Sequence, residues 1–221
     1  MEFTLLWAAL TAVGAAWLGT RVWPGGLPER PLDELITAAI VGLVAGRLAA
    51  MVVQGTNPLT NLSDFLIVRG GVLTPVASLG FIIALWAVND RSLVRLDAFS
   101  PVVMAGLAGW HSGCLWRDAC LGAASDVPWA FAGAGSSITR HPVELYAAIG
   151  LVLAAFVVSR LPASPGLRAS AGLSMASLIR LATEPLRPSL TSAPAVWYAI
   201  GVVIGLLGVA AASWAAKREP T

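Results

Sequence analysis

The chain has 221 residues, of which 57% are hydrophobic and only 12% are charged, about half the charged share of an average soluble domain. This composition excludes a soluble globule, which needs more polar surface, and a disordered chain, which needs low hydrophobicity and high charge. The 14 basic and 12 acidic residues are scattered and form no basic run, so nucleic acid is not an expected partner.

Long apolar blocks without strand-like alternation predict an all-α, polytopic membrane protein rather than a barrel. A helix that crosses a bilayer needs about 20 such residues. About seven blocks of this kind follow one another, with short loops and one longer connection between them, so residues 1–221 are expected to form a single integral membrane domain. In chain order the predicted transmembrane helices are 3–19, 34–54, 72–88, 101–116, 142–159, 166–183 and 195–216.

The basic residues of the loops predict the orientation, because cytoplasmic loops carry an excess of Lys and Arg. If the N-terminus lies outside, the inner loops and the C-terminus hold most of the basic residues, among them Arg21, Arg30, Lys217 and Arg218. The first block has no positive n-region and no convincing cleavage site, so we interpret it as a retained helix. The expected topology is N-out/C-in.

The chain has two cysteines, Cys114 and Cys120. Their spacing fits neither a zinc site nor a redox Cys-x-x-Cys motif, and no metal site is expected. The simplest interpretation is two free thiols in an apolar segment. The alternative is a disulfide on the outer face of the membrane.

Two arginines, Arg47 and Arg180, lie within predicted spans, where a guanidinium costs about 2.5 to 3.5 kcal/mol on insertion scales. Glu184 follows Arg180 by four residues and shares its helix face. This pair either neutralises itself or contributes to a site for an anion or a lipid headgroup, and the second interpretation is favoured. Arg47 fits a packing role and a ligand contact equally well.

The heptapeptide Arg-His-Pro-Val-Glu-Leu-Tyr at residues 140–146 opens the fifth predicted span. Proline is well placed in a first helical turn, and the N-terminus of a helix attracts anions. Arg140 adds a fork of donors that suits phosphate oxygens, while Glu144 and Tyr146 could orient the neighbouring groups. The alternative is an interfacial anchor, with the tyrosine at the level of the lipid headgroups.

His111 closes the fourth predicted span and is the one imidazole expected inside a span. A single histidine in this position more often makes a hydrogen bond between helices than it acts as a base. Both roles stay open on the sequence alone.

Taken together, these motifs resemble the prolipoprotein diacylglyceryl transferase family of the bacterial inner membrane. Residues 140–146 are similar to the family sequence Arg-His-Pro-x-Gln-Leu-Tyr, and residues 128–130 match the Pro-Trp-Ala element that precedes it. Arg180 and Glu184 match the Arg-x-x-x-Glu of its sixth span, and residues 46–48 (Gly-Arg-Leu) are similar to its second helix. The order and spacing of these motifs agree with the family.

The resemblance implies an enzyme that moves the diacylglyceryl group of phosphatidylglycerol onto the thiol of a lipobox cysteine, with glycerol phosphate leaving. The implied partners are an anionic phospholipid and a prolipoprotein signal peptide, and no cofactor is implied. The implied location is the bacterial inner membrane. The candidate catalytic residues are then His111, Arg140 and Arg180, and the candidate substrate-binding residues are Arg47, Gly122, His141, Glu144, Tyr146 and Glu184.

The sequence also departs from the family pattern. Pro75 stands where the family carries a histidine in the third span, and His111 and Cys114 stand where it carries Arg and Asn in the fourth. These differences indicate a divergent member, whose alternative role is a catalytically degenerate protein that binds phospholipid or a signal peptide. A small transporter or channel is a third hypothesis, disfavoured because no internal repeat is visible.

Overall fold

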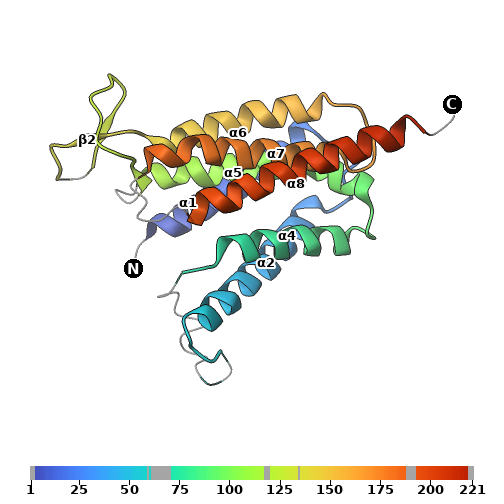
Figure 1. Cartoon of the computed structure of the whole chain (residues 1–221), viewed down its shortest axis with the longest axis horizontal. Helices are drawn as coiled ribbons and strands as arrows, with labels where there is room; N and C mark the ends of the chain where they lie inside the picture. The colour runs from blue at the N-terminus through green and yellow to red at the C-terminus, as the bar shows by residue number, and fades with distance from the viewer. Residues whose placement is uncertain are drawn as a thin grey trace. The chain divides into compact units, whose positions relative to one another are not determined.

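The computed structural model describes residues 3–58, 60, 71–116, 120–133, 135–187 and 193–218. Within those residues the chain forms α1 (Phe3–Val22), α2 (Pro31–Val53), α4 (Thr74–Val88), α5 (Leu93–Gly113), α6 (Val143–Ser159), α7 (Leu167–Thr183) and α8 (Ala193–Ala216) (Figure 1). Two short 3-10 helices, η1 (Cys114–Trp116) and η3 (Glu184–Leu186), follow α5 and α7. The strands β1 (Phe131–Ala132) and β2 (Thr139–Arg140) form a small antiparallel pair between α5 and α6.

The helical content and the apolar outer faces confirm the prediction of an all-α, polytopic membrane protein. By length and composition, three of the described helices could cross a bilayer: α2, α5 and residues Pro194–Ala216 of α8. The shorter helices α4 and α6 are also apolar, and large apolar side chains are exposed along the helices, as lipid contact requires. The seven-span count and the N-out/C-in orientation stay predictions.

Each predicted span coincides with a helix, and the largest difference is at the start of α5. The apolar block in the sequence places this start at Pro101, but the helix begins at Leu93 and Pro101 lies inside it. Asp97, Phe99 and Ser100 in the added turns are buried. Tertiary packing therefore extends the helix beyond the point where local propensity would begin it.

The chain divides into two compact units. The larger unit consists of Met1–Leu27 and Asp97–Thr221, and the smaller unit of Pro28–Leu96. The prediction of a single integral membrane domain stays a prediction.

In the smaller unit, α2 packs against α4. Arg47 lies on α2, is only 5% exposed, and donates a hydrogen bond from Nη1 to the Gly71 carbonyl at 2.9 Å. The Leu73 amide donates to the Gly46 carbonyl at 3.0 Å, one residue before Arg47. Arg47 therefore joins the end of α2 to the segment that enters α4, which is the packing role that the sequence left open.

The larger unit has its core between α5, α6 and α7, where Leu151, Ala155 and Val158 of α6 are fully buried. Helix α8 packs closely against α7, because glycines of α8 lie against serines of α7. A Cβ added at Gly205 would come within 2.6 Å of the Ser174 side chain. Small residues at such an interface let helix backbones approach closely inside a bilayer.

The N-terminus of α7 is capped by a side chain from another helix. Gly166 occupies the N-cap position in a left-handed conformation and has no side chain to cap with. Asp97 of α5 instead accepts hydrogen bonds from the backbone amides of Gly166 and Ala169, each at 2.8 Å. This carboxylate satisfies amides that every helix start leaves unpaired, and it fixes α7 against α5.

The segment between α5 and α6 is tied down by backbone hydrogen bonds. Phe131 pairs with Arg140 and Ala132 with Thr139 in the two-stranded sheet. Figure 1 shows this sheet beyond the N-terminal end of α6. The Thr139 hydroxyl donates to the Ser125 carbonyl at 2.7 Å. These hydrogen bonds hold the described residues that lead into α6.

Candidate functional site

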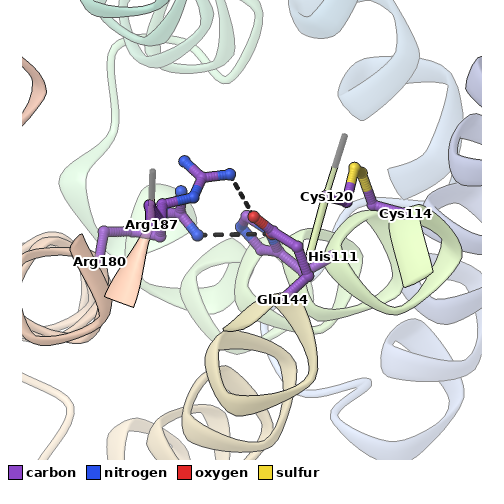
Figure 2. Close-up of a disulfide and its surroundings, with 6 residues drawn as sticks. All are labelled: His111, Cys114, Cys120, Glu144, Arg180 and Arg187. Atoms are coloured by element: carbon purple, nitrogen blue, oxygen red, sulfur yellow. Dashed lines mark hydrogen bonds and ion pairs between the residues drawn. A yellow bond between two sulfur atoms is a disulfide. The ribbon is translucent and has the colours of Figure 1, made fainter. Parts of the chain in front are cut away.

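The centre of the candidate site is the carboxylate of Glu144, which is 1% exposed and lies in the first turn of α6. One oxygen, Oε2, contacts Nδ1 of His111 and also accepts a hydrogen bond from Nη1 of Arg180 at 3.5 Å. The other oxygen, Oε1, pairs with Nη2 of Arg187. Figure 2 shows both guanidinium groups turned toward the carboxylate, with the His111 ring beside it.

Four different parts of the chain supply these side chains. His111 lies near the end of α5, Arg180 near the end of α7, and Arg187 directly after η3. Because α6 runs in the opposite sense to α5 and α7, its first turn meets their last turns at the same end of the larger unit. We call these four residues (His111, Glu144, Arg180 and Arg187) the Glu144 cluster.

The Glu144 cluster carries more positive than negative charge. Two guanidinium groups face one carboxylate, so at least one positive charge remains in excess among these four side chains, whatever the protonation of His111. The side chain of Arg187 is 32% exposed, while those of Arg180 and His111 are 11% and 13% exposed. Partly desolvated arginines with spare donors are suited to a phosphate group.

Gly122, a candidate substrate-binding residue, connects three segments that position the cluster. Its amide donates to the His141 carbonyl at 2.8 Å, and its own carbonyl accepts from Nη1 of Arg140 at 3.3 Å. A Cβ at this position would lie 2.5 Å from the Leu186 carbonyl oxygen and would clash with Val143. Glycine is therefore required by packing.

His141 and Tyr146 form a second polar group beside the start of α6. Nδ1 of His141 lies 3.3 Å from the Tyr146 hydroxyl, which also accepts a hydrogen bond from Nε1 of Trp129 at 2.7 Å. Trp129 comes from the Pro-Trp-Ala element, so this element and the heptapeptide meet through their side chains. Arg140 lies one residue before His141 and is held by the Gly122 carbonyl.

A self-neutralising pair of Arg180 and Glu184, the less favoured of the two interpretations, is not what the structure shows. Helix α7 ends at Thr183, so Glu184 belongs to η3, and the acidic partner of Arg180 is Glu144. Glu184 is 7% exposed, and its Oε2 has no hydrogen-bond partner within the described part of the chain. Arg180 is thus committed to a carboxylate of another helix, and it has not simply neutralised its neighbour.

The interpretation of Cys114 and Cys120 as free thiols is wrong, because the two sulfur atoms form a disulfide. The bond links η1 to Cys120, and Figure 2 places it next to His111. Spacing alone does not decide this pairing. The structure brings the two Cα atoms to 5.9 Å, within the range that disulfides require.

Arg187 is the member of the Glu144 cluster that the sequence did not single out. In the sequence, only its position three residues after the Arg180–Glu184 motif draws attention to it. The turn of η3 directs its side chain back to Glu144. Arg47, by contrast, belongs to the smaller unit.

These features define a polytopic helical membrane protein with a buried, net positive cluster of His, Glu and Arg at one end of its helices. The family model for prolipoprotein diacylglyceryl transferase matches residues 3–219, and the chain belongs to that family.

Individual relatives agree with this assignment. The phosphatidylglycerol–prolipoprotein diacylglyceryl transferase of Cupriavidus necator is 27% identical over 219 residues, covering 88% of this chain and 79% of the relative. The protein of the same name from Cupriavidus pinatubonensis is 25% identical over 235 residues, covering 97% and 83%. That of Mesorhizobium japonicum is 33% identical over 159 residues, covering 64% and 53%.

Proposed function

We propose that this chain is a phosphatidylglycerol–prolipoprotein diacylglyceryl transferase. It transfers the diacylglyceryl group from phosphatidylglycerol to the thiol of a lipobox cysteine, and glycerol phosphate leaves. The observation that carries the proposal is the Glu144 cluster, in which two arginines from different segments converge beside a histidine. This arrangement offers a phosphate site and an imidazole within one small region.

The arginines act on the donor lipid. As the bond between the glyceryl carbon and the phosphate oxygen breaks, negative charge grows on the departing phosphate. In this proposal Arg180 and Arg187, which converge on Glu144, neutralise this charge, because a pre-positioned donor in a site of low dielectric is the most effective form of such stabilisation. Arg140, held at the Gly122 carbonyl, supplies a further guanidinium at the same end of α6.

The remaining candidate residues shape the site around this phosphate. Gly122 fixes the segments on either side, His141 and Tyr146 provide polar groups at the start of α6, and the unpartnered Oε2 of Glu184 is a potential acceptor for the glycerol headgroup. Arg47 is a substrate-binding candidate only on its resemblance to the family motif.

We place the site under the outer leaflet of the bacterial inner membrane. A disulfide persists in an oxidising compartment, and Cys114 lies just beyond the end of α5. The ends of α5 and α7 and the start of α6 then face outward, in agreement with the N-out/C-in topology expected from the basic residues. An exported prolipoprotein would present its lipobox cysteine on this side.

Transfer by the purified protein tests the proposal. The full chain is reconstituted into vesicles with or without phosphatidylglycerol and incubated with a peptide carrying a lipobox cysteine. We expect a lipidated peptide and glycerol phosphate, in equal amounts, only when phosphatidylglycerol is present. Arg180→Gln should remove most of this activity, whereas Arg168→Gln, which changes an arginine at the other end of α7 bound to the Leu161 carbonyl, should not.

The second candidate function is a phospholipid-binding or signal-peptide-binding protein without catalysis. It is favoured by the departures from the family pattern at Pro75, His111 and Cys114. Native mass spectrometry would then find bound phosphatidylglycerol that Arg180→Ala abolishes, while the vesicle assay yields no lipidated peptide from protein that remains folded.

A further inference from the structure

We propose that His111 is the base that removes the proton from the lipobox thiol, and that Glu144 is the positioning residue that orients its ring. This inference rests on the proposed transferase function and names the groups that activate the acceptor. The Glu144 cluster would then have two parts: arginines that act on the phosphate and a carboxylate–imidazole pair that acts on the thiol.

The contact between the two side chains determines which nitrogen is available. Nδ1 of His111 faces Oε2 of Glu144. A carboxylate accepts hydrogen bonds, so the proton of a neutral imidazole is held on Nδ1 and the lone pair lies on Nε2. Nε2 has no hydrogen-bond partner within the described ranges of the chain, and the side chain is 13% exposed. The lone pair of Nε2 is thus not engaged by the described part of the chain.

The carboxylate itself is held from two other directions. Arg180 bonds to the same oxygen as His111, at 3.5 Å, and Arg187 pairs with the other oxygen. Glu144 is 1% exposed and begins a helix, so its side chain has little freedom. A base whose ring is fixed by a third group is the recurring arrangement in sites that activate a thiol or hydroxyl.

The other imidazole of the chain is less suited to this task. Nδ1 of His141 lies 3.3 Å from the Tyr146 hydroxyl. That oxygen already accepts the N–H of Trp129 at 2.7 Å, so its own proton is available to donate to His141. The Nδ1 lone pair is then occupied, and no carboxylate contacts the His141 ring within the described residues. His111 is the imidazole with an acidic partner.

The proposed step is a displacement at carbon. The thiol proton passes to Nε2 of His111, and the sulfur electron pair forms a bond to the glyceryl carbon that carries the phosphate. The bond between that carbon and the phosphate oxygen breaks, and its electron pair leaves with glycerol phosphate. The proton on His111 is then released to the departing phosphate or to water. The product is a thioether, and no oxidant, reductant or metal ion is consumed.

Replacing the sulfur of the lipobox cysteine by selenium distinguishes a base at His111 from a merely structural His111. A selenocysteine peptide ionises at neutral pH without help, so it needs no base. In His111→Asn, the side-chain amide can still donate to Glu144 while the basic Nε2 is absent. With the cysteine peptide we expect kcat to fall about 100-fold or more, the range typical for loss of a general base. With the selenocysteine peptide the loss should shrink to about tenfold or less.

Three further variants complete the test. Arg180→Gln, which affects the phosphate, should lose activity equally with both peptides. Glu144→Gln should lower kcat for the cysteine peptide by about tenfold or more, with partial recovery on selenocysteine. The part of its effect that passes through His111 should be absent from the double variant with His111→Asn, whereas the part that passes through Arg180 and Arg187 should remain and be equal with both peptides. Thermal unfolding of each variant in detergent checks that the protein is folded.

The outcomes distinguish the inference from the function on which it depends. If the wild-type protein transfers lipid and folded His111→Asn loses activity equally with both peptides, or loses none, then His111 is not the base and the transferase assignment still stands. If the wild-type protein transfers lipid to neither peptide, the transferase function is wrong and the inference fails with it.

Discussion

Gly122 gives a sharp test of how the Glu144 cluster is held together. A Cβ at this position would lie 2.5 Å from the Leu186 carbonyl oxygen and 3.1 Å from that of His141. To restore ordinary contact near 3.4 Å, the Leu186 oxygen must move by about 0.9 Å. Arg187 is the next residue, so its guanidinium moves relative to Glu144. The substitution Gly122→Ala therefore reaches the site through the backbone, without removing any charged group.

Both stability and rate should respond. Overpacking of this kind typically costs about 1 to 3 kcal/mol, which corresponds to a fall in Tm of roughly 2 to 12 °C for a chain of this size. A displacement of about 1 Å in catalytic geometry can cost about 100-fold in rate. We expect Gly122→Ala to lose roughly that factor in kcat while it stays folded at the assay temperature.

The assay measures transfer to a lipobox peptide in vesicles of phosphatidylglycerol, with thermal unfolding in detergent alongside. Gly14→Ala is the matched control, because nothing lies within 4 Å of a Cβ at Gly14 in α1, and it should match the wild type in both measurements. If Gly122→Ala transfers lipid at the wild-type rate with an unchanged Tm, the proposed link between packing at Gly122 and the geometry of the cluster is wrong.

Three other predictions follow from the contacts. Arg187→Gln removes the guanidinium proposed to contact the departing phosphate, and a charge-assisted contact of this kind is worth about 1.5 to 3 kcal/mol. The value of kcat/KM for phosphatidylglycerol should therefore fall about 10- to 150-fold, and a loss below about twofold would remove Arg187 from the site. Asp97→Ala deletes the cap of α7 and should lower the free energy of unfolding by about 2 kcal/mol, measured by thermal unfolding, where an unchanged Tm would contradict the capping role. Cys114 and Cys120 should react with a maleimide only after reduction, and ready labelling of the native protein would contradict the disulfide.

The sequence by itself determined the class of protein and the positions of its helices. Low charge and long apolar blocks exclude a soluble fold, because such a chain cannot cover its surface with polar groups. Inside a bilayer each helix satisfies its own backbone hydrogen bonds. Helix existence is therefore a local property that hydropathy detects. The heptapeptide at residues 140–146 likewise indicated the family and drew attention to Glu144, because its residues are adjacent in the chain.

Only the tertiary structure decided which side chains meet. Arg180 pairs with Glu144, 36 residues away, and not with Glu184, four residues away along the chain, because α7 ends at Thr183 and packs against α6. The contact of Arg187 with Glu144 and the Cys114–Cys120 disulfide likewise depend on how separate segments pack together. Buried charges are satisfied by whichever partner the packing of helices brings within reach, and that partner is set by the arrangement of whole elements in space, which no local pattern records.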